Sequence, residues 1–402
     1  MHLATMASLI IALMGGAPAS APEELTLKVA LAEAAARAPG VAEAREREAV
    51  ALGEMEVART LAPLAVLLGA GGNEPHWSVG VAQRLPVPGA RAARVHAAEQ
   101  GVRSAEGERH ASEARARAEA RRAYFSLVRA AQLVDTARRA LELARESEEA
   151  ARLRFQTGAA PELDLVQARL ARASAEAQLL TQQGEVEALS AELALFLGRD
   201  PRRLLQPSHG PPLRLPSLEE VLARAGQAPL AQARQADVAA AEATLRAARQ
   251  ERWPAPSVGA AVEGEGPGGA SVFLRGSLDL EVPLPGLGRG EVDRAAASVR
   301  VASALAAEDR QRRFSEIVAA HQRLAAALAA LDRFSADILP ATDTAERMAL
   351  ESYRAGRSAL VSLNDARRAA TDTRAQAIEA AFNAQAAFAA LELAAGVALD
   401  ES

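Results

Sequence analysis

The sequence contains no cysteine among its 402 residues. This absence excludes disulfide bonds, thiolate metal ligands, a cysteine nucleophile and a lipid-bearing cysteine near the N-terminus. The six histidines are scattered, with no pair at ligand spacing, so we expect no metal site. The sequence also lacks a serine nucleophile elbow and a glycine-rich phosphate loop ahead of a helix, so we expect neither catalysis nor a bound cofactor.

Aromatic residues are scarce, at 3% of the chain, although half of all residues are apolar and alanine is abundant. A compact domain of this length normally buries more large side chains. Alanine, arginine and glutamate with helical periodicity instead predict long helices that pack closely together. The net charge of −5 argues against nucleic acid as a partner, because phosphate binding needs a basic surface.

Long hydrophobic runs are also missing, apart from a short one near the N-terminus. Residues 7–14 form an apolar core interrupted only by Ser8, and the small residues Ala19, Ser20 and Ala21 follow, as is typical of a secretory signal peptide cleaved after Ala21. A buried N-terminal helix is the alternative. Because no apolar run of about 18 residues follows, we expect no transmembrane helix. We therefore predict a signal peptide over residues 1–21 and an exported protein without a helical anchor.

Two segments that contain glycine or proline residues each occur twice in the chain, at nearly the same spacing. RFQTGAAPELDLVQAR at 154–169 is similar to SYRAGRSALVSLNDAR at 352–367, at a shift of 198 positions. RLPVPGAR at 84–91 is similar to EVPLPGLG at 281–288, at a shift of 197. The second match aligns Pro86, Pro88 and Gly89 with Pro283, Pro285 and Gly286. Because two independent motifs share one register, we expect an internal duplication.

Each half of the chain then carries the same order of expected elements. The first repeat, 22–198, holds short helices over 27–37 and 41–60, a strand pair over 64–85, and a long helical hairpin of 91–156 and 162–197. The second repeat, 217–395, holds helices over 218–226 and 230–250, a strand pair over 257–283, and a hairpin of 290–354 and 360–394. A proline-rich linker, 199–216, joins the repeats, and a tail, 396–402, follows them.

The returning helices show apolar and small residues at steps of three and four, which is typical of a coiled-coil seam. In the first hairpin the expected seam is Leu163, Val166, Leu170, Ala173, Ala177, Leu180 and Gly184, which we expect to face Leu127, Ala131, Val134, Ala137, Leu141 and Ala144. In the second hairpin it is Leu363, Ala366, Ala370, Thr373, Ala377, Ala380 and Ala384. Small side chains allow a close approach but bury little area, so such a hairpin needs neighbours.

The expected helix over 91–156 is too long for a globular core of this chain. At 1.5 Å per residue it would extend for about 100 Å. We therefore expect it to be part of an elongated assembly.

The expected strands alternate apolar and polar residues. One face carries Trp77, Val79, Val81, Leu274, Leu278 and Leu280, and the other carries Arg84, Arg275, Asp279 and Glu281. Surface hairpins with one wet face are one interpretation. Ten-residue alternating strands also suit a membrane barrel, with the apolar face toward lipid and the polar face toward a water-filled lumen. Four strands cannot close a barrel, and an open edge cannot lie in lipid, so this second interpretation requires several chains to share one barrel.

The doubled order of strand hairpin and helical hairpin resembles the TolC-like outer-membrane efflux proteins. The helix ALAEAAARAP and the Tyr/Phe-x-x-Gly…Leu-x-x-Ala-Arg turn of each half carry the resemblance, and LPVPGARAAR is most similar to the branch that serves heavy-metal cation pumps. The resemblance implies a mainly α fold with a small β part, and a homotrimer that shares one twelve-stranded barrel in outer-membrane lipid. It also implies helices that extend into the periplasm as a tunnel, and a passive exit duct joined through a periplasmic adaptor protein to an inner-membrane pump of the RND type.

The resemblance also implies roles for particular residues. The hairpin turns would be the adaptor-docking tips, namely Thr157, Gly158, Ala159, Ala355, Gly356 and Arg357. Asp164, Ser362 and Asp365 fall near the positions of the periplasmic gate, where a ring of Asp365 carboxylates would attract cations and Arg357 would pair with a neighbouring carboxylate. A helix cap and a solvated helix face are the alternative interpretations of these residues. Pro340 interrupts the second long helix, where we predict a kink.

A soluble periplasmic coiled-coil adaptor or scaffold is the rival class. Its strands would form a small separate lobe. An adaptor does not need two strand hairpins, doubled in the chain, with apolar faces placed ahead of each long helix, and this pattern favours the outer-membrane duct.

Overall fold

The computed structural model describes residues 23–71, 73, 75–208, 210, 213–265, 271–281 and 289–399. The expected signal peptide, 1–21, and the aligned residues Pro283, Pro285 and Gly286 lie outside the described residues. The fold is mainly helical with a small β part, as the sequence predicts.

The chain forms two compact units. The helical unit comprises Met1–Val41, Glu113–Ala223 and Glu316–Ser402, and the sheet unit comprises Ala42–Ser112 and Arg224–Ser315. Two long helices have residues in both units, α4 (Ala90–Gln156) and α8 (Arg289–Arg333).

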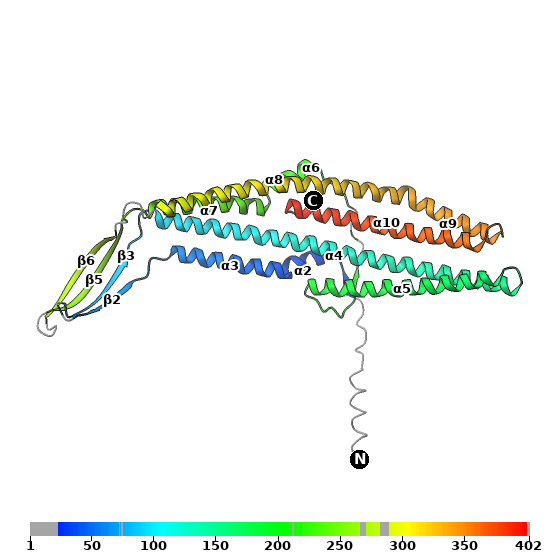
Figure 1. The fold of residues 1–402 in the computed structure, drawn as a ribbon, viewed down its shortest axis with the longest axis horizontal. Coiled ribbons are helices and arrows are strands. Elements are labelled where there is room, and N and C mark those ends of the chain that lie inside the picture. The colour runs from blue at the N-terminus through cyan, green and yellow to red at the C-terminus, as the bar shows by residue number, and fades with distance from the viewer. Residues whose placement is uncertain are drawn as a thin grey trace, which may run out of the picture. The chain divides into compact units, whose positions relative to one another are not determined.

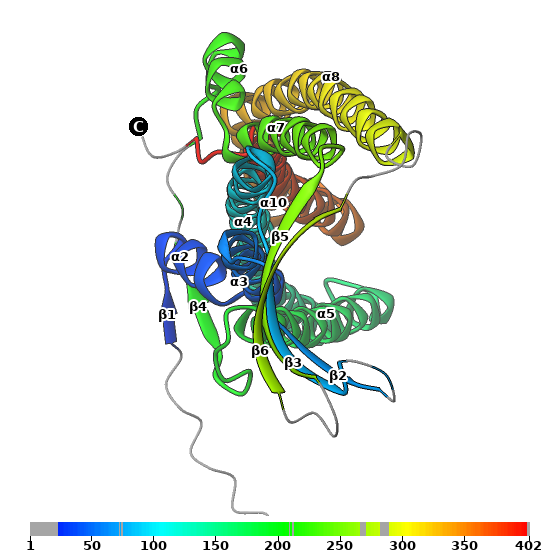
Figure 2. The ribbon, with the colours of Figure 1, turned by 90° about the vertical axis from the view of Figure 1, so that its left-hand side faces the viewer.

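The sheet unit holds four strands and the ends of the helices that adjoin them. The remaining helices of this unit are α3 (Pro39–Arg59) and α7 (Pro229–Gln250). The strands are β2 (Ala65–Ala70), β3 (Trp77–Arg84), β5 (Ala255–Glu265) and β6 (Ser271–Glu281). They form one antiparallel sheet in the order β2-β3-β5-β6, so the two hairpins lie side by side, as Figures 1 and 2 show.

The helical unit is built mainly from two helical hairpins. Its elements are β1 (Glu23–Leu25), α2 (Leu27–Arg37), α5 (Glu162–Phe196), β4 (Leu205–Pro207), α6 (Leu218–Gly226), the π-helix η3 (Phe334–Ile338), α9 (Leu339–Arg354) and α10 (Leu360–Ala395). In both halves of the chain two shorter helices precede a strand hairpin, which is followed by a helical hairpin. Ala38 and Ala228, the residues before the prolines that begin α3 and α7, have nearly the same extended backbone, with ψ of 139° and 146°.

Part of the expected linker is ordered structure, which the sequence analysis did not predict. β4 pairs in parallel with β1, and the hydroxyl of Tyr124 donates to the carbonyl oxygen of Ser208 at 2.6 Å. The hydrogen bond from Arg199 to Glu33 raises the pKa of Arg199 and fastens the start of the linker to α2. The β1–β4 pairing cannot be predicted from periodicity, because a strand of three residues is too short to show a repeating pattern.

A core of apolar side chains lies where α2, α4 and α5 meet within the helical unit. Leu25, Tyr124, Leu127, Leu193 and Leu197 are all buried in it. Burial raises the pKa of the Tyr124 hydroxyl, whose polar end is satisfied by backbone carbonyl groups of the linker and of β1. Tyr124 therefore stabilises the point where the linker leaves the first hairpin.

The seam expected on the first returning helix is wrong for a single chain. Leu163, Leu170 and Leu180 are exposed, whereas Leu165 and Ala168 face the chain's own helices. The second seam is correct at Leu363, Ala370, Ala377 and Ala384, which are all buried on α10. The buried phase of α5 is therefore shifted by two residues from the expected one.

The second long helix contains a π-helical segment at the position where a kink is expected. Residues 334–338 form η3, directly before Pro340 in the first turn of α9. Proline has no backbone N–H and its ring crowds the carbonyl group four residues earlier. A widened π turn accommodates this mismatch while the helix continues. The first long helix has Glu142 at the equivalent position and stays α-helical throughout.

Gly107 lies at a close approach between α4 and α7. A Cβ atom there would lie 2.5 Å from the Cβ of Ala233 and 2.6 Å from the carbonyl oxygen of Pro229. We expect Gly107→Ala to lower the free energy of unfolding by about 1–3 kcal/mol through overpacking. At Gly101, six residues earlier, an added Cβ atom would have nothing within 4 Å, so Gly101→Ala should raise the free energy of unfolding by up to about 1 kcal/mol. Denaturant unfolding of both variants checks the difference, and equal effects would contradict the packing.

Candidate functional site

One face of the sheet is apolar across all four strands. The register places Leu68, Val79, Val262 and Leu274 in one row and Trp77 and Val272 on either side of Gly264 in the next. Leu68 is 77% exposed and Leu274 is 80% exposed. The six residues expected to contact lipid, Trp77, Val79, Val81, Leu274, Leu278 and Leu280, all lie on this face. Such a face in water would be a large apolar patch without a cover.

The opposite face of the sheet carries the charged side chains. Arg84 pairs with Glu281 at 2.9 Å, and Arg275 pairs with Glu263 at 3.1 Å. Asp279 lies opposite Ser257 in the register, on the same face. The four residues expected to face the lumen, Arg84, Arg275, Asp279 and Glu281, therefore share one face. Leu67 and Phe273 are apolar exceptions on it.

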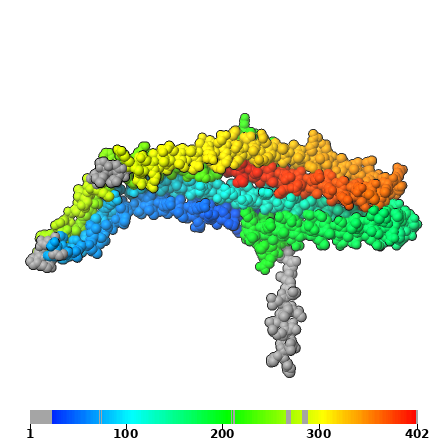
Figure 3. Space-filling view, viewed as in Figure 1, coloured from blue at the N-terminus to red at the C-terminus, as the bar shows by residue number. Residues whose placement is uncertain are grey.

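The sheet ends in two unpaired edges. β2 and β6 are its outer strands, and within the described residues neither pairs with another strand on its outer side. Figure 3 shows that no helix of the sheet unit covers the strands on the side turned to the viewer. An edge of this kind presents a row of free N–H and C=O groups to any strand that can pair with it.

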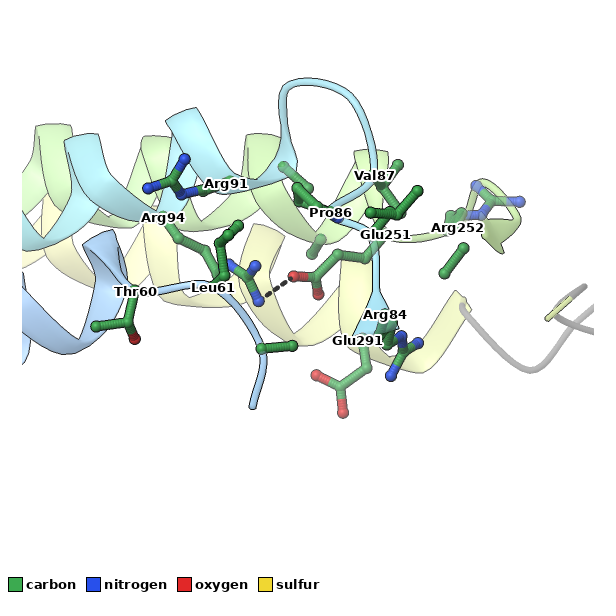
Figure 4. A pocket seen from close by; sticks show the side chains of 15 residues that line it. Thr60, Leu61, Arg84, Pro86, Val87, Arg91, Arg94, Glu251, Arg252 and Glu291 are labelled. Carbon is green, nitrogen blue, oxygen red and sulfur yellow. Dashed lines mark ion pairs between the residues drawn. The ribbon is translucent and has the colours of Figure 1, made fainter. Parts of the chain in front are cut away.

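A cavity of about 470 Å³ lies at the junction between the strands and the helices of the sheet unit. Its lining comes from the ends of α3, β3 and α7 and the starts of α4, β5 and α8. Four arginine side chains line it, and Arg94 pairs with Glu251 at 3.3 Å (Figure 4).

The two helical hairpins turn by the same local geometry. Gly158 has φ of +75° and Gly356 has φ of +69°, a left-handed conformation that glycine adopts without steric cost. The amide of the following residue donates to the carbonyl oxygen five residues earlier, at 2.8 Å for Ala159 and 2.9 Å for Arg357. These are Schellman caps, and Thr157 adds a side-chain bond to the Leu153 carbonyl oxygen. A Cβ on either glycine would meet nothing within 4 Å, so both turns are open to a partner.

The expected gate residues lie just beyond these turns. Asp164 lies in the first turn of α5, half-buried, and Ser362 and Asp365 are exposed at the start of α10. In the part of the chain that the structure describes, Asp164, Asp365 and Arg357 form no ion pair with one another. Pro161 precedes α5 as its N-cap residue and does not lie within its first turn.

A link between the hairpins that the sequence analysis missed centres on Arg367. Its guanidinium reaches from α10 to α4, where it donates to the Leu143 carbonyl oxygen at 2.8 Å and to the Ser147 hydroxyl. Burial lowers the pKa of Arg367, because the charge is partly removed from water. No short motif marks this contact, because its two ends are more than two hundred positions apart.

A small apolar cluster and an aromatic contact support the same link. Ala151, Ala168, Tyr353, Leu360 and Leu363 pack together, so both hairpins contribute to one cluster close to the turns. The guanidinium of Arg154 lies 5.2 Å from the ring centroid of Tyr353, a cation–π contact between α4 and α9.

Two arginines of α4 bind α10 farther from the turns. Arg121 pairs with Glu392 at 3.1 Å and lies over the ring of Phe388, and its residue is only 1% exposed. Arg129 pairs with Glu379 at 3.0 Å and lies over Phe382 in the same manner. These contacts hold the second hairpin against the first along the helical unit.

Within the described ranges, no helix is apolar over a stretch long enough to cross a bilayer. The same residues contain no group of three or more histidine or acidic side chains placed to hold a metal ion.

Comparison by sequence with family models gives a match within the first half of the chain. Residues 30–199 match the model of the outer membrane efflux protein family. This match confirms the resemblance inferred from the sequence motifs. Compared with curated proteins by sequence, the chain has no match.

Solved structures with the same fold cover nearly the whole chain. A structure of CusC, described in terms of transmembrane channel formation, has a TM-score of 0.77 at 18% identity and covers 92% of each chain. The outer membrane protein VceC from Vibrio cholerae has a TM-score of 0.75 at 18% identity, covering 92% of this chain and 96% of that one. The outer membrane channel MtrE from Neisseria gonorrhoeae, in its open state, has a TM-score of 0.74 at 20% identity, covering 92% of this chain and 89% of that one. At these identities the similarity establishes the fold.

Proposed function

Since residues 30–199 match the model of the outer membrane efflux protein family, we propose that the protein is an outer-membrane channel and the exit duct of a tripartite efflux pump. It conducts substrate passively from an inner-membrane pump and a periplasmic adaptor protein across the periplasm and the outer membrane. The observation that carries this proposal is the sheet, whose apolar face is exposed on all four strands while its charges gather on the other face.

The sheet also supports assembly into a trimer. Both outer strands have free edges, and unpaired backbone groups cannot lie in lipid. Because the described sheet has an even number of strands, β2 of a neighbouring copy runs antiparallel to β6, as a closed barrel requires. Three copies give twelve strands, above the minimum of about eight that a membrane barrel needs.

The helices support the same assembly. Leu163, Leu170 and Leu180 form an exposed apolar stripe on α5, which no other part of the described chain covers. Exposed apolar residues also lie on the part of the second long helix that belongs to the helical unit, among them Ile338 and Met348. Contact between the α5 stripe of one copy and the second long helix of the next would bury both surfaces and complete a closed wall of helices.

The hairpin turns are the proposed docking site of the adaptor. We expect Ala159→Trp to reduce export in cells, because the bulky side chain would occupy the open space beside the Gly158 cap without changing the glycine. The purified trimer and its conductance should be unchanged. Arg138→Trp, at an exposed position on α4 away from the turn, is the matched control. Normal export by the Ala159→Trp protein would contradict docking at this turn.

Asp365 is the proposed source of cation preference at the gate. In a trimer, three exposed carboxylates near the turns would form a ring that attracts cations. We expect Asp365→Asn to lower the cation-over-anion permeability ratio by about threefold. Asp135→Asn on α4, whose carboxylate pairs with Arg138, is the control. Reversal potentials under a salt gradient measure both, and an unchanged ratio for Asp365→Asn would refute the ring.

Fractionation tests the proposed function as a whole. The proposal predicts a detergent-requiring trimer that is recovered with the outer membrane and dissociates on heating. A soluble monomer in the periplasmic fraction would contradict it and favour the soluble adaptor or scaffold.

A further inference from the structure

The rows of paired residues that cross the sheet shift away from the helices of the sheet unit between β2 and β6. One such row joins Ala65 on β2, Ala82 on β3, Gly259 on β5 and Ser277 on β6. Ala65 lies six residues beyond the end of α3, whereas Gly259 lies nine residues beyond the end of α7. The row therefore shifts by three residues over these two strands.

The two strands that run back toward the helices show the same shift. Each of them leads into the repeated proline motif that precedes a long helix. Pro86 lies four residues after Ala82, whereas Pro283, which aligns with Pro86, lies six positions after Ser277 in the sequence. The shift over these two strands is two residues. Two to three residues for every two strands amount to four to six residues over four strands.

Closure of a trimeric barrel converts this shift into an offset where two copies meet. Three copies related by a rotation place every β2 at the same level. A row that leaves β6 therefore meets β2 of the next copy four to six residues farther from the helices than the point where it began. An odd offset is excluded, because it would turn the apolar face of one copy to the same side as the polar face of the next. The offset is thus four or six residues.

The tilt of the strands in membrane barrels supports the same offset independently. Neighbouring strands lie about 4.8 Å apart and rise about 3.3 Å per residue. An offset of four or six residues over four strands then corresponds to a tilt of about 35° or about 46°. Membrane barrels have tilts of about 35–45°. An offset of two residues or none would leave the strands tilted by only about 20° or less.

We propose that the copies join with β2 displaced by four to six residues along β6, so that Leu68 of one copy lies opposite Leu278 or Leu280 of the next. Without an offset, Leu68 would lie opposite Leu274, where its own row ends. This proposal rests on the proposed function, because only a shared barrel brings β2 and β6 together. The offset pairs the short β2 with the half of β6 that is nearer the helices.

Cysteine cross-linking of the full-length protein in outer membranes measures the offset. Leu68→Cys is combined in turn with cysteine at one β6 position, namely Val272, Leu274, Gly276, Leu278 or Leu280. A disulfide requires Cα atoms within about 7 Å, and a step of two residues moves the Cα atom by about 6.6 Å along a strand. Each combination therefore reports one register. We expect the Leu278 or the Leu280 position to give at least about fivefold more disulfide-linked species of three chains than Leu274.

A pair within one chain calibrates the yields. Leu68 lies opposite Val79 in the same sheet, so Leu68→Cys with Val79→Cys should form an intrachain disulfide and remain a monomer on a denaturing gel. Leu68→Cys with Val81→Cys, one register step away, should give little disulfide. Leu68, Leu274 and Leu278 are similarly exposed, at 77%, 80% and 77%, so access of the oxidant does not favour one position.

The outcomes distinguish the offset from the proposed function. The highest yield of three linked chains at Val272, Leu274 or Gly276 would overturn the offset and leave the trimeric barrel intact. Formation of the intrachain control without a link between chains at any of the five positions would contradict the shared barrel, and with it the proposed function.

Discussion

Replacing Arg367 with alanine should raise the open fraction of the reconstituted channel by roughly 10- to 100-fold. The Arg367 guanidinium connects α10 to the Leu143 carbonyl oxygen and the Ser147 hydroxyl on α4, close to the hairpin turns. A hydrogen bond from a charged donor contributes about 1.5–3 kcal/mol. The expected change of 10- to 100-fold corresponds to about 1.4–2.8 kcal/mol, the net loss of one such bond while water replaces the other. If the turns separate when the channel opens, this energy stabilises the closed state only, and its loss shifts the equilibrium toward the open state.

The neighbouring residue supplies the control for this prediction. Arg368 is exposed on α10, so Arg368→Ala removes the same charge without removing the link. Planar-bilayer recordings at neutral pH compare the two variants with the parent. Equal open fractions in the parent and Arg367→Ala would show that the contact does not hold the gate. The Arg367→Lys channel should have an open fraction between those of the parent and Arg367→Ala, because a lysine keeps the charge but has fewer donors and a different geometry.

Replacing Arg121 with alanine should lower the free energy of unfolding by about 3–5 kcal/mol. Arg121 is almost completely buried between α4 and α10, where it pairs with Glu392 and covers the ring of Phe388. Glu392 also accepts the amide of Leu399 at 2.9 Å, so the pair holds the end of the second hairpin. Its removal leaves a largely buried carboxylate without this ion pair and opens space beside an aromatic ring.

A second substitution separates the ion pair from general damage to the core. Arg121→Met combined with Glu392→Gln removes both charges and keeps most of the volume, so we expect it to recover at least half of the lost stability. Arg138→Ala, which breaks an exposed pair with Asp135 on α4, should change stability by less than about 0.5 kcal/mol. Denaturant unfolding in detergent measures all three proteins. A loss below about 1 kcal/mol for Arg121→Ala would contradict the assigned burial.

Local patterns in the sequence predict the element order well. The prolines after Ala38 and Ala228 lie where helices begin, the glycines of the hairpin turns lie where helices end, and the alternating segments form strands. The sequence does not predict in this way which face of α5 packs against the helices of its own chain. Its apolar residues lie on two faces, and steps of three and four select Leu163 and Leu170 as readily as Leu165 and Ala168. A helix that contacts its own chain on one side and another copy on the other needs both seams, so periodicity alone does not identify the internal one.

The alignment of the two repeats indicates the buried face of α5, which periodicity alone does not. At a shift of 198, Leu165 aligns with Leu363, and both are buried. The Arg367 link and the β1–β4 pair had no such signal. Each depends on residues brought together over more than 170 positions, through side-chain or three-residue contacts that leave no periodic trace. Such contacts are set by the packing of whole helices, which a single sequence does not specify.

The pairing of β2 of one copy with β6 of the next tests the central claim most directly. The chain has no cysteine, so engineered thiols report this edge alone. Leu68→Cys on β2 is combined in turn with cysteine at one of five β6 positions on the same face, Val272, Leu274, Gly276, Leu278 and Leu280. A closed trimeric barrel predicts that at least one combination gives a disulfide-linked species of three chains on a non-reducing gel. Monomers or an open ladder of larger species at every position would contradict it.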